Sequence, residues 1–238
     1  MKLLALDSSG LVASVAVLED ENLLGEYTTN VKKTHSQTLL PMLDEILRMT
    51  GQKLDSIEAI AIASGPGSFT GLRIGSATAK GLGLALNKPL ISVPTLEALA
   101  YNLFDTARWI CPIMDARRNQ VYTGIYAFEN HLLKVQKEQC AIAIEELIEI
   151  LNTMGREIIF LGDGVPVQQG TIKEKMKVPY SFAPAHVNRQ RAAAVGALGM
   201  VYYAQGRIET AAEHQPEYLR LSQAERERAS KIAEGKLN

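Results

Sequence analysis

The chain has 238 residues, of which 47% are hydrophobic and 21% charged, and its formal net charge at pH 7 is −1. A chain of this length can bury a substantial core, as one domain or as two similar halves. The near-neutral charge argues against tight binding of RNA or DNA by this chain alone, because phosphate neutralisation supplies most of that affinity. No stretch approaches the roughly 18 consecutive apolar residues of a membrane span, so we expect a cytoplasmic protein that does not enter a membrane.

The cysteines and histidines do not predict a metal centre. Cys111 and Cys140 stand in no metal-like or redox-like spacing, so we expect them to be reduced and structural. The histidines are too far apart in sequence to form a local ligand set. They are His35, His131, His186 and His214.

The first 28 residues predict a β-meander. Strands are expected at 3–7, 12–18 and 23–28, with tight turns between them. The first turn, Ser8-Ser9-Gly10, is small enough for a phosphate to approach. Asp7, at the end of the first strand, is therefore a candidate cofactor-binding residue, although a lone acid at a strand end more often closes a turn.

A helix is predicted from Thr34 to Met49. Its apolar positions cover about half of the circumference, whereas one buried face needs a stripe of only about 100°. One interpretation is a second contact surface for another protein, and the other is a helix that lies unusually deep in its own domain. The positions proposed for the contact surface are Leu39, Met42, Leu43 and Ile46.

The stretch from Ala59 to Asn87 organises the chain. It predicts a buried strand, a turn at 64–67 and a helix that begins near Ser68 and runs to about Leu86. This helix carries several glycines, and each interior glycine costs about 0.5–1 kcal/mol relative to alanine. A stripe without large side chains recurs at every fourth residue, at Gly71, Gly75, Ala79 and Gly83. Such a stripe serves either as a docking surface for another chain or a phosphate, or for close packing on the protein's own sheet or a neighbouring helix.

The pattern then begins again. After a strand at 90–93 and a helix at 95–103, a second meander starts at Ile110, and its Asp115 aligns with Asp7. A helix at 145–154, a strand at 158–161 and a long Ala-rich helix from Asn188 to about Gln205 follow. We therefore predict a duplicated α/β fold with lobes at 1–104 and 105–221 and a solvated or disordered tail at 222–238.

Two such halves, each with an Asp-bearing hairpin turn, are the plan of the actin, sugar kinase and Hsp70 class of proteins, in which the turns cradle ATP phosphates. The specific strings resemble the TsaB (YeaZ-like) family. They are LALDSS, THSQTLLP, SGPGSFTGLRIG, PTLEALA and the late PEYLR. The resemblance is dense over residues 1–101, weak afterwards, and returns at 216–220. It implies the same two-lobed actin-like fold.

The resemblance also implies that this chain is not itself an enzyme. The sister family, the TsaD-like transferases, carries a His-x-x-x-His metal pair, and the corresponding positions here are Thr95 and Leu99, neither of which can replace an imidazole ligand. The sister's glycine-containing turn corresponds to residues 115–118, which lack glycine. We therefore expect no catalytic residue and no cofactor or metal of its own, with ATP and a metal ion bound by partner subunits.

The partners follow from the same resemblance. It implies a heterodimer with a TsaD-like transferase through the helices at 34–49 and 69–86, an added TsaE-like ATPase, and contact with tRNA through the complex. The assembly would form N6-threonylcarbamoyladenosine at position 37 of tRNAs that read codons starting with adenosine. The isolated chain is expected to form a homodimer through the same surface.

Three alternatives stay open. One is an autonomous actin-fold ATPase or phosphotransferase that uses Asp7 and Asp115. Another is a peptidase, for which the sequence spacing reveals no catalytic set, although such residues can be distant in sequence. The third is a purely structural protein of another pathway.

Overall fold

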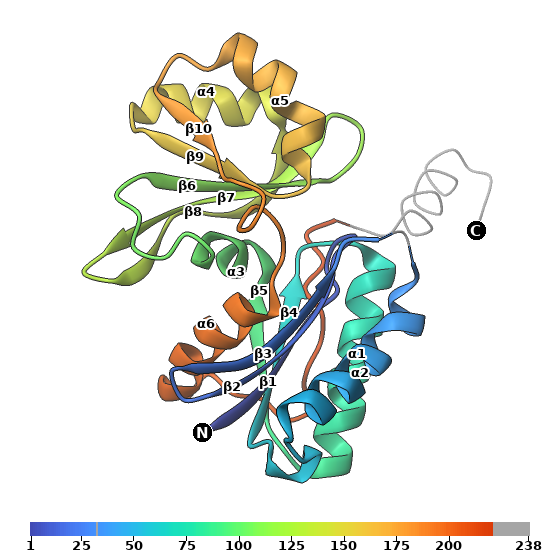
Figure 1. Ribbon diagram of the computed structural model, residues 1–238. Helices are drawn as coiled ribbons and strands as arrows, with labels where there is room; N and C mark the ends of the chain where they lie inside the picture. Colours follow the sequence, from blue (N-terminus) through green and yellow to red (C-terminus); the bar gives the residue numbers. More distant parts are fainter. Residues whose placement is uncertain (32, 221–238) are drawn as a thin grey trace, which may run out of the picture.

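A computed structural model describes residues 1–31 and 33–220 of the chain. Two lobes are stacked one above the other, each built on a five-stranded sheet (Figure 1). The first lobe contains, in chain order, β1 (Lys2–Asp7), β2 (Ala13–Glu19), β3 (Asn22–Thr29), α1 (His35–Thr50), a 3-10 turn (Leu54–Ser56), β4 (Ala59–Gly65), α2 (Phe69–Leu86), β5 (Leu90–Pro94) and α3 (Thr95–Tyr101). There follow β6 (Trp109–Asp115), β7 (Gln120–Glu129), β8 (Leu132–Ala143), α4 (Ile144–Met154), β9 (Ile158–Leu161), α5 (Gly164–Lys175), β10 (Tyr180–Phe182) and α6 (Ala192–Ala204).

The two sheets have the same topology. Their strand orders are β3-β2-β1-β4-β5 and β10-β9-β6-β7-β8, so β1 corresponds to β6 and β4 to β9. In both lobes the first strand pairs antiparallel with the second and parallel with the fourth. Tight turns join the antiparallel strands, while each parallel pairing requires a crossover that contains a helix. The predicted duplicated, two-lobed actin-like fold is confirmed.

Local signals explain where α1 and α2 begin and end. Thr34 is the N-cap of α1, and Gly51 ends it in the left-handed conformation at a φ of 66°. Ser68 caps α2, its hydroxyl accepting the backbone N–H of Gly71 at 3.3 Å. Both caps lie at the positions that the sequence predicts.

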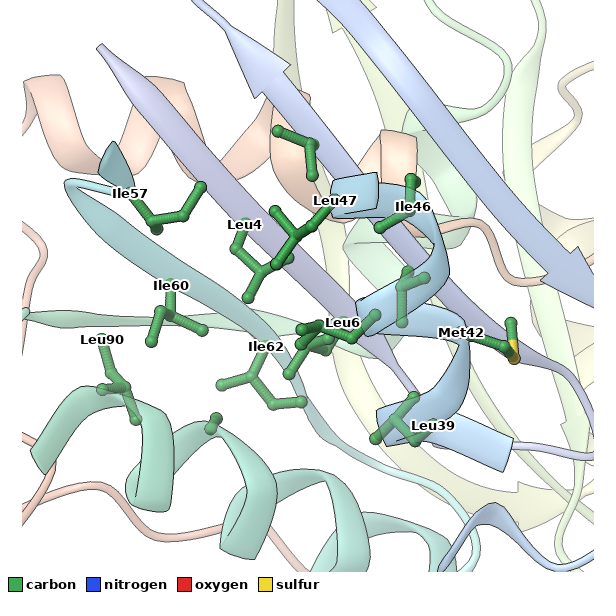
Figure 2. Close-up of a cluster of buried hydrophobic side chains, with 14 of the residues drawn as sticks. Leu4, Leu6, Leu39, Met42, Ile46, Leu47, Ile57, Ile60, Ile62 and Leu90 are labelled. Atoms are coloured by element: carbon green, nitrogen blue, oxygen red, sulfur yellow. The ribbon is translucent and has the colours of Figure 1, made fainter. Parts of the chain in front are cut away.

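The core of the first lobe lies between its sheet and the two helices α1 and α2. Figure 2 shows the side chains of α1 directed at those of β1 and β4. Each fully buried aliphatic side chain contributes about 1.5–3 kcal/mol to folding. The members from α1 are Leu39, Met42, Leu43, Ile46 and Leu47. The structure thus selects the interpretation that α1 lies deep in its own lobe, and the side chains expected to face a partner are core residues.

The predicted lobe boundaries need a correction, because the chain returns to the first lobe after β10. Helix α6 covers the face of the first sheet opposite α1 and α2, where Val195 and Leu198 pack with Leu3 and Ala5 (Figure 1). Residues 105–221 are therefore not one lobe. The interval 222–238, expected to be solvated or disordered, lies outside the described residues.

The start of α6 also differs from the prediction. It begins at Ala192 and not at Asn188, because its first N–H groups find acceptors in the first lobe. The N–H of Ala192 donates to the Ser14 hydroxyl at 2.8 Å, and that of Ala193 to a Glu26 carboxylate oxygen at 2.9 Å. These caps come from residues more than 160 positions away. A local sequence pattern could not reveal them.

Helix α3 connects the lobes. Leu96 and Leu99 pack in a cluster with Ile110, Met114 and other residues of the second sheet.

Within the described ranges, no helix is long and apolar enough to cross a membrane.

Candidate functional site

The turn after β1 is closed by its own residues. The Oδ1 atom of Asp7 accepts the backbone N–H of Ser9 at 2.9 Å and the Ser9 hydroxyl at 2.7 Å. Burial raises the pKa of Asp7 from 3.8 to about 6, while the two hydrogen bonds from Ser9 act in the opposite direction. The carboxyl group thus serves as a turn acceptor, which is the structural role that competes with a cofactor role.

The corresponding turn of the second lobe repeats this arrangement. Asp115 Oδ1 accepts the backbone N–H of Arg117 at 2.8 Å, again two residues further along the chain. The backbone N–H of Asp115 itself donates to Asp163 Oδ1 at 3.2 Å. Burial raises the pKa of Asp163 above its ordinary value. Each of the three acidic residues, Asp7, Asp115 and Asp163, therefore already accepts a backbone N–H.

No metal centre is formed by this cluster. In residues 1–31 and 33–220, no group of three His, Cys, Asp or Glu side chains is arranged to hold a metal ion. The four histidines that the sequence contains remain dispersed over the two lobes.

The glycine stripe of α2 packs on the turn after β1. A Cβ atom at Gly71 would lie 2.1 Å from the Ser8 carbonyl oxygen, and one at Gly75 would lie 2.3 Å from the Ser8 hydroxyl. At Gly83 the obstacle would be Leu90, at 2.4 Å. Ala79 is fully buried in the same core. Contacts within the chain therefore account for the stripe, and its four positions offer no surface to another protein.

The opposite side of α2 is exposed and largely apolar. Gly81 lies there, and a Cβ atom added to it would meet nothing within 4 Å. Ala77 and Ala85 are exposed beside it, and the Leu84 side chain is 66% exposed. The four-residue spacing of the stripe does not reveal this side, because spacing alone does not show which glycine lacks a neighbour in the fold.

Helix α1 extends this exposed side. It lies beside α2 over the same face of the sheet (Figure 1) and exposes Leu40. We call the outer surface of these two helices the α1–α2 face, defined by Leu40, Ala77, Gly81, Leu84 and Ala85. Exposed apolar groups gathered on one surface are typical of protein–protein interaction sites.

The positions aligned with the metal pair of the transferases have structural roles here. Thr95 is fully buried at the start of α3, and its hydroxyl accepts the backbone N–H of Gly65 at 3.1 Å. Leu99 packs in the apolar cluster at the second lobe. Neither side chain presents an imidazole nitrogen or a carboxylate to a metal ion.

A Ser–His–Glu line that sequence spacing did not reveal lies under α2. The Ser76 hydroxyl is 2.9 Å from His214 Nε2, and His214 Nδ1 is 2.8 Å from Glu209 Oε1. This is the order of contacts in a serine hydrolase triad. However, Ser76 is 5% exposed and His214 is 0% exposed, so no substrate carbonyl can reach the hydroxyl. These hydrogen bonds instead attach the segment after α6, which contains Glu209 and His214, to Ser76 of α2.

The chain is similar over most of its length to a known family. The model of the TsaD family, described as tRNA N6-adenosine threonylcarbamoyltransferase, matches residues 22–228. A protein of Bacillus subtilis (strain 168), described as "tRNA threonylcarbamoyladenosine biosynthesis protein TsaB", is 33% identical over 227 residues, which cover 94% of this chain and 96% of that protein. The protein of the same description in Escherichia coli (strain K12) is 32% identical, over 69% of this chain and 72% of its own length.

Solved structures agree with these relatives. YeaZ from Pseudomonas aeruginosa superposes with a TM-score of 0.79 at 28% identity, over 92% of this chain and 99% of the solved chain. A second structure from the same organism, described as an uncharacterised protein with similarity to peptidase YEAZ, has a TM-score of 0.80 at the same identity.

Proposed function

This chain belongs to the TsaB family of tRNA threonylcarbamoyladenosine biosynthesis proteins, and from that membership we propose that it takes part in forming N6-threonylcarbamoyladenosine in tRNA. Its role is that of a non-catalytic partner that activates a TsaD-like transferase. The modified position is adenosine 37 of tRNAs that read codons starting with adenosine. We expect the protein to act in the cytoplasm, together with a TsaE-like ATPase.

The observation that supports the non-catalytic role concerns the two positions that align with the metal-binding histidines of the transferases. The Thr95 hydroxyl accepts a hydrogen bond from the backbone N–H of Gly65, and Leu99 is buried in an apolar cluster. A metal ion therefore has no ligand at either position. The turn acids, Asp7 and Asp115, are likewise hydrogen bonded within their own turns. ATP and the catalytic metal ion are therefore assigned to the partner subunits.

The surface we assign to the transferase is the α1–α2 face. Gly81 supports this assignment, because an exposed glycine within a helix costs about 0.5–1 kcal/mol relative to alanine, and none of the described residues lies within 4 Å of a Cβ atom at this position. A partner backbone that approaches closely at this point would account for it. The exposed Leu84 side chain, three residues further along α2, supplies apolar area beside it. In the isolated chain the same face would join two copies.

The function is tested by threonylcarbamoyl transfer to tRNA. Transfer is measured with this chain alone, with the TsaD-like partner alone and with both, in the presence of TsaE-like ATPase, ATP and threonylcarbamoyl-AMP throughout. We expect efficient transfer only in the mixture. Transfer by this chain alone would contradict the non-catalytic role, and full transfer by the partner alone would contradict the role of activator.

The interface is tested by paired glycine variants. Gly81→Arg places a long charged side chain in the α1–α2 face, while Gly170→Arg does the same on α5, where a Cβ atom also has open space around it. We expect Gly81→Arg to lower the affinity for the transferase at least tenfold and Gly170→Arg to leave it unchanged, as measured by titration calorimetry. Equal affinities of the two folded variants would contradict this interface.

The alternative of an autonomous ATPase or phosphotransferase is tested separately. Micromolar binding of Mg²⁺ and ATP to the isolated chain, lost on Asp7→Asn, would favour it over the proposed role. We expect no such binding, because the Asp7 carboxyl group is buried and already hydrogen bonded to Ser9.

A further inference from the structure

The chain after α6 runs back along the first lobe to the lobe junction. Figure 1 shows this segment, in red, passing beside β5 and α2. Glu209 pairs with Leu90 of β5, and His214 is anchored under α2 by Ser76. The Lys80 ammonium group donates to the His214 carbonyl oxygen at 2.9 Å. These contacts lead residues 216–220 to the N-terminal end of α2.

Residues 216–220 then cover the turn after β4. The backbone N–H of Glu217 donates to the Ser64 carbonyl oxygen at 2.7 Å. Gly65 has a φ of +128°, and a Cβ atom on it would lie 2.2 Å from the Glu217 carbonyl oxygen. Since a backbone oxygen cannot swing away as a side chain can, this approach requires glycine at position 65.

An aromatic stack fixes the segment on the first lobe. The rings of Tyr218 and Phe69 are parallel within 2°, with centroids 4.1 Å apart. The Arg73 guanidinium group donates to the Tyr218 hydroxyl at 3.3 Å and lies over the Phe69 ring. Such pairs add to the free energy of area burial, so this contact attaches the segment to α2.

The same few residues also contact the second lobe. The Gln139 side chain, on β8, donates to the Glu217 carboxylate at 2.8 Å. The Arg220 guanidinium group donates to the carbonyl oxygen of Ala116, next to the turn that Asp115 closes. Residues 216–220 thus contact both the turn after β4 in the first lobe, which contains Gly65 and is called the glycine turn below, and the hairpin turn after β6 in the second lobe.

We propose that residues 216–220 form a clasp that holds the two lobes at a fixed relative position. Glu217 is bound on both sides, through its backbone to Ser64 and through its side chain to Gln139. Because Tyr218 and Arg220 are only two residues apart, the chain between them cannot lengthen without breaking one of the two attachments. The clasp also shields the glycine turn, so a ligand that reaches Gly65 has to displace it.

The clasp is tested on the isolated full-length chain by amide hydrogen exchange. Tyr218→Ala removes the stack, and we expect exchange at residues 64–73 and at the hydrogen-bonded amides of Ala116 and Gln120 to become at least about tenfold faster. Tyr203→Ala is the matched control, since Tyr203 has the same 37% exposure as Tyr218 but lies on α6. It should leave exchange at both places unchanged.

A second variant separates a clasp from ordinary packing. Arg220→Ala removes the bond to Ala116 of the second lobe and leaves the Tyr218 stack in place, so exchange should rise at Ala116 and Gln120 and stay unchanged at 64–73. Small-angle scattering of Tyr218→Ala should in addition report a larger radius of gyration than that of the wild type. Unchanged exchange at Ala116 and Gln120 in both folded variants, with an unchanged radius, would overturn the clasp.

Discussion

Asp7 and Ser9 are joined by two hydrogen bonds to one carboxylate oxygen, from the backbone N–H at 2.9 Å and from the hydroxyl at 2.7 Å. Asp115 and Arg117 repeat the backbone bond in the second lobe. The two acids that the sequence marks as possible phosphate or metal residues are thus the residues that close the hairpin turns. Their energetic role is open to measurement in the isolated protein.

Replacement of Asp7 should change how stability depends on pH. Burial raises the pKa of Asp7 from 3.8 to about 6, so between about pH 4 and pH 6 the folded protein holds a proton that the unfolded chain has released. Ionisation of Asp7 therefore lowers the free energy of unfolding as the pH rises through this window. We expect the free energy of unfolding of Asp7→Asn, relative to wild type, to increase by up to about 3 kcal/mol from pH 4 to pH 7.

Urea denaturation at pH 4, 5.5 and 7 measures this difference. Asp44→Asn, at an exposed position of α1, is the control and should give a difference that stays flat. A flat difference for Asp7→Asn as well would mean that Asp7 ionises in the folded protein as freely as in the unfolded chain.

A single methyl group should have opposite effects on the two sides of α2. At Gly71 it would meet the Ser8 backbone oxygen at 2.1 Å, so Gly71→Ala should destabilise the protein by about 1–3 kcal/mol. At Gly81 it would meet nothing within 4 Å, so Gly81→Ala should stabilise it by about 0.5–1 kcal/mol. Urea denaturation of both variants gives the comparison, and a loss of stability in Gly81→Ala would show that its outer side is not free in solution.

The enclosed Ser76–His214 contact should stabilise the protein without supporting catalysis. Ser76→Ala leaves His214 Nε2 buried without its partner, and we expect a loss of about 1–3 kcal/mol in the free energy of unfolding. A fluorophosphonate probe should not label Ser76 in the native wild type, because both side chains are shielded from solvent. Stoichiometric labelling at Ser76 would instead indicate a hydrolase with an opening that this structure lacks.

The two thiols should differ in reactivity. Burial raises the pKa of Cys111 to about 12, and it also raises the pKa of the half-buried Cys140. Since the thiolate is the reactive form, iodoacetamide at pH 8 should modify Cys140 slowly and Cys111 only after unfolding. Mass spectrometry of peptides over a time course distinguishes the two, and modification of Cys111 faster than global unfolding would contradict its placement in the core.

Much of the fold is determined by local sequence patterns. The length of the apolar runs predicts the strands, while Gly51 marks the end of α1 through its left-handed backbone and Ser68 marks the start of α2 through its hydroxyl. The repeat that aligns Asp115 with Asp7 predicts two equivalent sheets, which the topology confirms. These features need only interactions between residues close in sequence, or the recurrence of one pattern.

The tertiary structure alone decided which sides of these elements are inside. An apolar residue on α1, or a glycine on α2, packs equally well against its own sheet or against another protein, and the same spacing describes both. Leu39 and Gly75 pack on the first lobe and are buried, whereas Leu40 and Gly81 are exposed to solvent. The start of α6 on Ser14 and the meeting of Ser76 with His214 join positions far apart in the chain. Local patterns cannot encode such contacts, because they form only when the whole chain closes and buries these groups together.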